Sequence, residues 1–124
     1  MEKRQLGKTD MNVSVLGFGG AEIGYEGATS DIVEKLLNSA LDAGLNLVDT
    51  AECYESSEEL IGQTVSHRRE DFYLFTKCGH PRGVGSENWS KRSILESIER
   101  SLRRLKTDRV DLVQLHSCSE AVLK

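Results

Sequence analysis

The chain has 124 residues, of which 38% are hydrophobic and 29% charged, a composition typical of one soluble domain with its own core. A net charge of −4 argues against nucleic acid as a partner, and no apolar run approaches the roughly 20 residues of a membrane span. The chain opens with charged residues that do not resemble a secretory signal, and its three cysteines lack disulfide-framework spacing. We therefore expect a cytoplasmic protein with reduced thiols.

The first predicted element is a short β-hairpin, with arms at residues 2–6 and 12–16 around a turn at 7–10. Its second arm runs directly into the glycine-rich segment 16–20. Beyond that segment, residues 30–43 predict a helix, which Ser30 and Asp31 start and Gly44 ends in a left-handed cap. We expect its apolar side chains to form one buried stripe: Ile32, Val33, Leu36, Leu37, Ala40 and Ala43.

Three apolar runs, at residues 45–48, 72–76 and 110–115, predict further strands. Between the first two, Ser56 and Glu59 have the spacing of a capping box and predict a short helix through residue 65.

A long glycine-dotted loop at 78–89 precedes another predicted helix, which starts near Ser90. The apolar positions of this helix fall on one face: Ile94, Ile98, Leu102 and Leu105. Its arginines lie away from that face, so we expect them to be solvated: Arg100, Arg103 and Arg104.

Polar residues close the predicted strands: Asp49 follows the first run, Lys77 the second and His116 the third, with Tyr54 in the loop after Asp49. Helices between the runs predict parallel strands, whose carboxyl ends share one side of the sheet. These four side chains should therefore converge, which indicates an enzyme. The pattern alone leaves open whether the strands form a doubly wound sheet or part of a closed barrel.

The segment 49–62, with the sequence DTAECYESSEELIG, resembles the DTAxxYGxSExxLG segment of the aldo-keto reductases. The glycine-rich run at 16–20 is similar to the end of the first strand in that family, and residues 76–77 to the end of the third. Residues 101–116 are similar to its third helix and fourth strand. One departure lies beside the tyrosine, where Glu55 replaces a usual glycine.

This resemblance implies a fold of the α/β class, the N-terminal half of a (β/α)8 TIM barrel preceded by a short β-hairpin. It implies an oxidoreductase that reduces aldehyde or ketone carbonyls with NADPH, in which no metal is involved. Tyr54 would donate the proton, Lys77 would make the tyrosine a stronger acid, Asp49 would hold Lys77, and His116 would bond the carbonyl oxygen. Gly20, Ala21 and Asp49 would border the cofactor.

Length sets a limit on this prediction, because a whole barrel needs about 250 residues. Residues 1–124 would supply the hairpin, strands one to four and three helices, without strands five to eight or the phosphate-binding loops that follow strands seven and eight. We therefore expect NADPH to bind weakly to the chain alone and catalysis to require the full barrel.

Two other interpretations stay open. Cys78 with His80, and His116 with Cys118, lie at the ends of neighbouring predicted strands and could together form a tetrahedral zinc site. Alternatively, the two open edges of a half-barrel could pair with another copy or with a partner, which would make the chain a non-catalytic interaction module.

Overall fold

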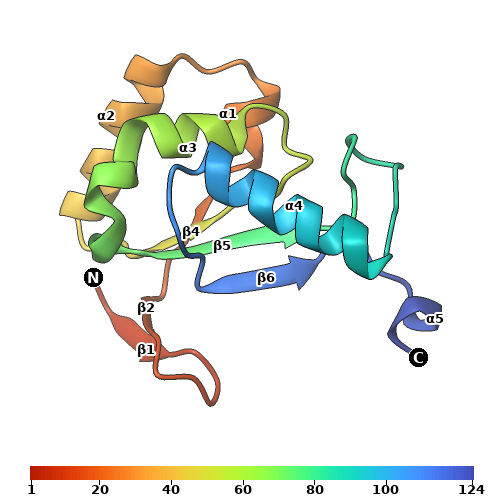
Figure 1. Ribbon diagram of the computed structural model, residues 1–124. Helices are drawn as coiled ribbons and strands as arrows, with labels where there is room; N and C mark the ends of the chain where they lie inside the picture. Colours follow the sequence, from red (N-terminus) through yellow and green to blue (C-terminus); the bar gives the residue numbers. More distant parts are fainter.

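The structure is a computed structural model that describes residues 1–124, and Figure 1 shows helices on one face of a sheet and a hairpin on the other. The hairpin pairs β1 (Lys3–Gln5) with β2 (Asn12–Ser14) in antiparallel register. The main sheet is parallel and its strand order follows the chain: β3 (Phe18–Gly19), β4 (Leu47–Asp49), β5 (Tyr73–Cys78) and β6 (Leu112–Leu115). The predicted four parallel strands behind a hairpin are confirmed.

Three helices connect consecutive strands of the main sheet, as predicted: α2 (Ser30–Asp42), α3 (Ser57–Val65) and α4 (Lys91–Arg104). Three shorter helical segments were not predicted: α1 (Ala21–Tyr25), the 3-10 helix η1 (Ser66–Asp71) and α5 (Glu120–Leu123). None of these three is long enough to show an amphipathic period. No helix in the structure combines the length and the apolar character that crossing a membrane demands.

The buried stripe of α2 is narrower than predicted. Val33, Leu37 and Leu41 are buried, whereas Ile32 and Leu36 are 59% and 46% exposed. These two side chains are uncovered because α2 flanks β3, the edge strand of the sheet, and no further helix lies beyond it. The predicted termination is confirmed, since Gly44 has a φ of +92°.

The capping-box prediction for α3 is wrong, although the helix begins at the expected place. Ser56 has φ −86° and ψ 4°, outside the extended region that a capping side chain requires, and makes no capping hydrogen bond. The hydroxyl of the next residue, Ser57, instead pairs with the Thr50 hydroxyl at 2.8 Å and ties the start of α3 to the end of β4.

The inward face of α4 is shifted by about one residue from the predicted one, although Leu105 at its end is buried as predicted. Its buried residues are serines 93, 97 and 101, and the isoleucines at 94 and 98 are only half-buried beside them. The expectation that the arginines are all solvated is also wrong. Arg100 and Arg104 reach buried carboxylates, those of Glu52 and Glu58, and only Arg103 is fully exposed.

The hairpin lies against the sheet at the amino-terminal ends of its strands. Met11 and Val13 pack on Phe75, on the face opposite the helices. Asn46, which precedes β4, accepts a hydrogen bond from the Ser14 amide at 2.6 Å and donates to the Asn12 carbonyl at 3.0 Å. The hairpin therefore closes this end of the sheet and leaves the carboxyl ends of the strands open.

Candidate active site

The carboxyl ends of β4 and β5 bring a lysine against an aspartate. Asp49 is the last residue of β4, and Lys77 lies one residue before the end of β5. The Lys77 Nζ donates to Asp49 Oδ2 at 2.5 Å and to the Thr50 carbonyl at 2.9 Å. The Lys77 side chain is 12% exposed, so water weakens this ion pair less than it weakens a pair on the surface.

Tyr54 and His116 complete a cluster around this pair. The Lys77 Nζ lies 5.0 Å from the centroid of the Tyr54 ring, a cation–π distance. The Tyr54 and His116 rings meet edge to face, with centroids 5.6 Å apart and an interplanar angle of 85°. The structure therefore brings together all four residues that the sequence singled out, at one end of the sheet.

The loop that carries Tyr54 is held by short local contacts. The Ser57 amide donates to the Tyr54 carbonyl at 2.9 Å, and Gly24 of α1 packs so close that a Cβ there would lie 2.0 Å from the same oxygen. Tyr25 adds a tilted ring contact to Tyr54 at 5.8 Å. Glu55 adopts a φ of +45°, so the position where the family resemblance expects glycine does require left-handed backbone.

Gln114 is a neighbour of the cluster that the sequence analysis missed. Its amide nitrogen donates to Asp49 Oδ1 at 3.2 Å, so both oxygens of Asp49 have partners. Gln114 pairs with Lys77 in the β5–β6 register and stands two residues before His116. Strand alternation places residues two apart on the same face, and this is the signal that would have identified it.

Glu52 is a second residue that was missed, and it joins three elements. Its side chain is 1% exposed, and Oε1 accepts hydrogen bonds from the Gly79 and His80 amides at 3.0 Å each. Its Oε2 accepts from Arg100 of α4 at 2.9 Å. This buried carboxylate therefore fixes the loop after β4 to the loop after β5 and to α4.

Glu58, in the first turn of α3, has a similar structural role. Its carboxylate accepts from the Thr76 hydroxyl at 2.6 Å and pairs with Arg104 at 3.4 Å. Burial raises the pKa of Glu58, and the hydrogen bonds from Thr76 and Ser101 and the charge of Arg104 offset only a fraction of that rise. Arg100 and Arg104 of α4 are thus structural partners of buried acids behind the candidate site.

The surroundings of His116 favour its neutral form. The pKa of His116 is lowered, first by burial, then by electrostatic interaction with Lys77 and His80, while Asp49 opposes the shift. Cys53 Sγ lies 3.2 Å from His116 Nδ1. His80 Nε2 donates to the His116 carbonyl at 2.8 Å, which anchors the backbone of this residue.

Gly20 and Ala21, the predicted cofactor neighbours, lie at the end of β3 beside Asp49. The Gly20 amide donates to the Asp49 carbonyl at 2.7 Å, and a Cβ on Gly20 would lie 2.8 Å from Ser57 Oγ. Close packing therefore explains this glycine by itself. Ala21 is half-buried as the first residue of α1, and contact of either residue with a cofactor stays a prediction.

The residues of the alternative zinc site do not assemble. No group of three or more His, Cys, Asp or Glu side chains in the structure could hold a metal ion. His80 Nε2 is engaged by the His116 carbonyl, and Cys118 Sγ points to the Ser119 carbonyl at 3.5 Å.

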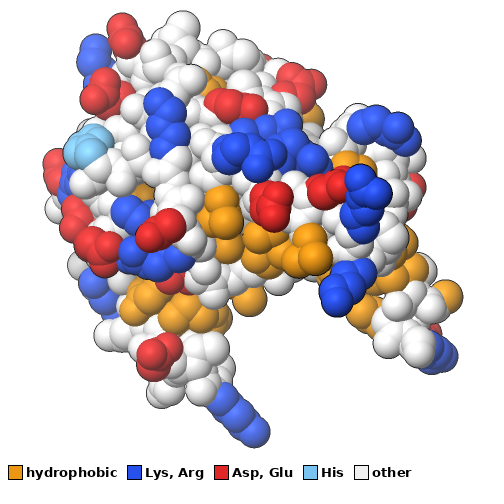
Figure 2. Space-filling view, viewed as in Figure 1, with side chains coloured by type: hydrophobic (Ala, Val, Ile, Leu, Met, Phe, Trp, Pro, Cys, Tyr) orange, Lys and Arg blue, Asp and Glu red, His pale blue; other side chains and the backbone are white.

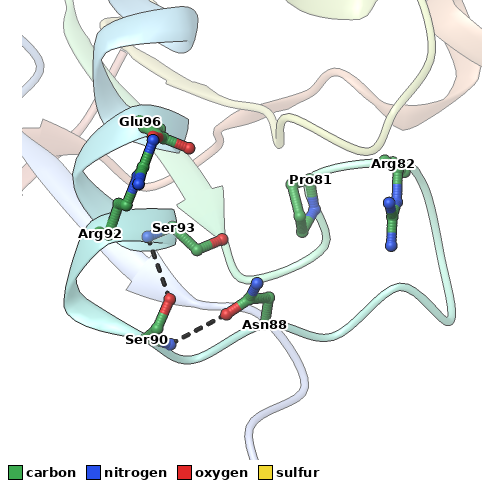
Figure 3. A pocket seen from close by; sticks show the side chains of 7 residues that line it. All are labelled: Pro81, Arg82, Asn88, Ser90, Arg92, Ser93 and Glu96. Atoms are coloured by element: carbon green, nitrogen blue, oxygen red, sulfur yellow. Dashed lines mark hydrogen bonds and ion pairs between the residues drawn. The ribbon is translucent and has the colours of Figure 1, made fainter.

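A polar cavity of about 340 Å³ lies near the amino-terminal end of α4 and contains none of the four clustered residues. Figure 3 shows Arg92 and Glu96 on the first turns of the helix and Arg82 across the loop. Arg92 is paired with Glu96 at 2.8 Å, and Ser90 and Asn88 are hydrogen-bonded in the helix cap. These contacts account for the cavity lining as a feature of the loop and cap.

Comparison with known proteins places this chain in a family. The sequence model of the Aldo/keto reductase family matches residues 15–122. The uncharacterized oxidoreductase YqkF of Bacillus subtilis (strain 168) is 40% identical over 122 residues, which span 94% of this chain and 39% of that protein. L-galactose dehydrogenase of Arabidopsis thaliana is 32% identical over 94% of this chain and 38% of its own length.

Solved structures agree with this match. A protein from Pseudomonas aeruginosa assigned as an aldo-keto reductase superposes with a TM-score of 0.91 at 36% identity, over 98% of this chain and 50% of that one. The holo form of an aldo-keto reductase from Bacillus halodurans gives a TM-score of 0.83 at 38% identity, over 93% and 40% of the two chains. The chain thus spans about two fifths to one half of the proteins it matches, and its sheet corresponds to the N-terminal portion of their barrels. It belongs to the aldo/keto reductase family.

Proposed function

We propose that this chain supplies the proton-transfer half of an NADPH-dependent carbonyl reductase, which converts aldehydes or ketones to alcohols within a complete barrel. The observation that carries the proposal is the cluster of Asp49, Lys77, Tyr54 and His116 at the open end of the sheet. The relatives support the general class of reaction only, because they include an oxidoreductase and a dehydrogenase.

Each residue has a step in this mechanism. Tyr54 transfers its phenolic proton to the carbonyl oxygen as that oxygen gains negative charge. The Lys77 ammonium, fixed by Asp49, stabilises the phenolate that is left behind. Neutral His116 donates a hydrogen bond to the same substrate oxygen, as an oxyanion-hole donor does.

The side chains of the cluster offer an acid and hydrogen-bond donors, but none of them can give a hydride. Carbonyl reduction at this cluster therefore needs a hydride donor such as a nicotinamide cofactor. When bound, the nicotinamide would supply the hydride to the carbonyl carbon. Asp49, whose side chain is 35% exposed, and the neighbouring Gly20 and Ala21 would border it. The phosphate-binding loops typical of such barrels lie beyond the length that this chain spans, so we expect weak NADPH binding by the chain alone.

All three cysteines are free thiols, Cys53, Cys78 and Cys118, and we propose a cytoplasmic, reducing location on that basis.

The test uses a completed barrel, in which this chain is joined to the C-terminal portion of its Bacillus subtilis relative. We expect transfer of deuterium from NADPH deuterated at nicotinamide C4 to the carbonyl carbon of an aromatic aldehyde, measured by mass spectrometry of the alcohol. Circular dichroism melting first establishes that the completed barrel folds. A folded barrel that transfers no deuterium to any aldehyde or ketone tested would contradict the proposal.

The uncovered sheet edges favour a second candidate, self-association or pairing with a partner. Ile32 and Leu36 on α2 are exposed at the β3 edge, and Leu112 and Leu115 of β6 are 37% and 41% exposed at the other. Figure 2 shows hydrophobic side chains gathered between α4 and β6. Apolar surface beside an open strand edge is typical of a surface that pairs with other protein.

A further inference from the structure

Cys53 makes a contact that the proposed mechanism does not use. Its sulfur lies 3.2 Å from His116 Nδ1, inside hydrogen-bond range for a thiol, and the residue is 5% exposed. The Tyr25 hydroxyl donates to the Cys53 carbonyl at 3.2 Å, which holds the backbone of Cys53 next to Tyr54. The thiol is therefore a fixed, buried neighbour of one nitrogen of the candidate carbonyl-binding histidine.

The backbone of His116 is fixed independently. Its amide donates to the Cys78 carbonyl at 2.9 Å, and its carbonyl accepts from His80 Nε2 at 2.8 Å. Orientation of the ring is left to its side-chain contacts, which are Cys53 at Nδ1 and edge-to-face contacts with the rings of Tyr54 and His80. The Nε2 atom makes no hydrogen bond within the protein and is not fully buried, so a substrate oxygen could reach it.

Both partners are neutral near pH 7. The pKa of Cys53 is raised, chiefly by burial, so the sulfur keeps its proton. The pKa of His116 is lowered, chiefly by burial, so the ring carries a single proton. A neutral imidazole nitrogen is a good acceptor, whereas a thiol sulfur is a weak one, and the arrangement S–H···Nδ1 is the stronger of the two possible hydrogen bonds.

We propose that Cys53 is a positioning residue that donates its S–H to His116 Nδ1 and thereby holds the imidazole proton on Nε2, where it faces the substrate oxygen. The role given to that proton depends on the proposed carbonyl reduction. The assignment of the tautomer does not depend on it. The residue acts through His116 and is not involved in the transfer of hydride or proton.

The test reads the tautomer directly in the chain labelled with ¹⁵N, by long-range ¹H–¹⁵N correlation spectra of the His116 ring near pH 7.5. The native chain should show a pyridine-type Nδ1 and a protonated, pyrrole-type Nε2. Cys53→Ala removes the donor and should shift the tautomer ratio toward Nδ1–H by about fivefold, the size expected for one lost hydrogen bond. Cys53→Ser restores an O–H donor and should return the Nε2–H form.

Cys118→Ala is the matched control, because that thiol contacts the Ser119 carbonyl and not a ring nitrogen. It should leave the His116 spectrum unchanged. A native His116 protonated on Nδ1, or a tautomer ratio that Cys53→Ala does not alter while backbone amide spectra show an intact fold, would overturn the inference. Absence of carbonyl reduction by the completed barrel, with the tautomer as expected, would count against the proposed function alone.

Discussion

Burial and the nearby Lys77 ammonium both favour the neutral form of the His116 ring. The pKa of His116 is lowered in the folded chain and is near its ordinary value of 6.5 in the unfolded chain. As the pH falls, the unfolded chain therefore takes up a proton at a higher pH than the folded chain does. Between the lowered value and 6.5 the unfolded state binds more protons, so stability rises with pH across that window and falls as pH decreases.

We predict that the NMR titration of His116 gives a pKa below 6.5 and that Lys77→Met raises it, because the substitution removes a positive charge beside the ring. Lys8→Met is the control, since Lys8 is exposed in the hairpin turn at the other end of the sheet. A His116 pKa at or above 6.5 in the native chain, or equal values in the two variants, would contradict this account.

At the residue scale the sequence predicted the four clustered side chains because three of them follow or end apolar strand patterns and the fourth, Tyr54, lies in the loop after Asp49. Asp49, Lys77 and His116 need only parallel strands to meet. Glu52 and Gln114 were not predicted because their roles come from partners 48 and 65 positions away, Arg100 and Asp49. The Glu52 pairing depends on which helix covers which loop, and no local pattern predicts it. Gln114 could have been identified from strand alternation, because it lies two residues before His116.

The β4–α3 loop holds one residue near the site in left-handed backbone. Glu55 holds a φ of +45°, which costs an L-residue roughly 1–2 kcal/mol. We predict that Glu55→Gly raises the free energy of unfolding by about 1 kcal/mol, since the relief exceeds the extra entropy that glycine gives the unfolded chain.

Ser56→Gly is the matched control in urea denaturation, because Ser56 is also exposed but has a φ of −86° and no capping hydrogen bond. It gains no relief of strain and should lower stability slightly. Equal effects of the two substitutions would show that the left-handed backbone at Glu55 stores no strain.

The elements were predicted well where apolar periodicity decides burial and poorly where it does not. In α2 the period located the helix, but it could not show that Ile32 and Leu36 are exposed, because no other helix packs beyond α2 at the edge of the sheet. In α4 the inward face consists of serines 93, 97 and 101, small residues that let the helix approach the buried acids. A hydrophobicity pattern counts serine as polar, so it predicts that this face of α4 is exposed.

For the whole molecule, the two uncovered edges should determine its behaviour in solution. We predict that the 13.8 kDa chain associates as concentration rises, observed by light scattering, because each edge exposes apolar side chains. The double variants Ile32→Lys/Leu36→Lys and Leu112→Lys/Leu115→Lys should each shift the chain toward monomer.

Val84→Lys serves as the control, since Val84 is 77% exposed in the loop before α4 and belongs to neither edge strand. It should leave association unchanged. A chain that stays monomeric at every accessible concentration would remove self-association from the second candidate function.

The central claim, that Tyr54 donates the proton, is tested most directly by steady-state turnover of the completed barrel. Tyr54→Phe should lower kcat by about 100-fold or more, the contribution of a general acid, while the NADPH Kd stays within about twofold. Tyr73→Phe, at the opposite end of β5 beside the hairpin, should change neither. Near-normal turnover in Tyr54→Phe would contradict the account.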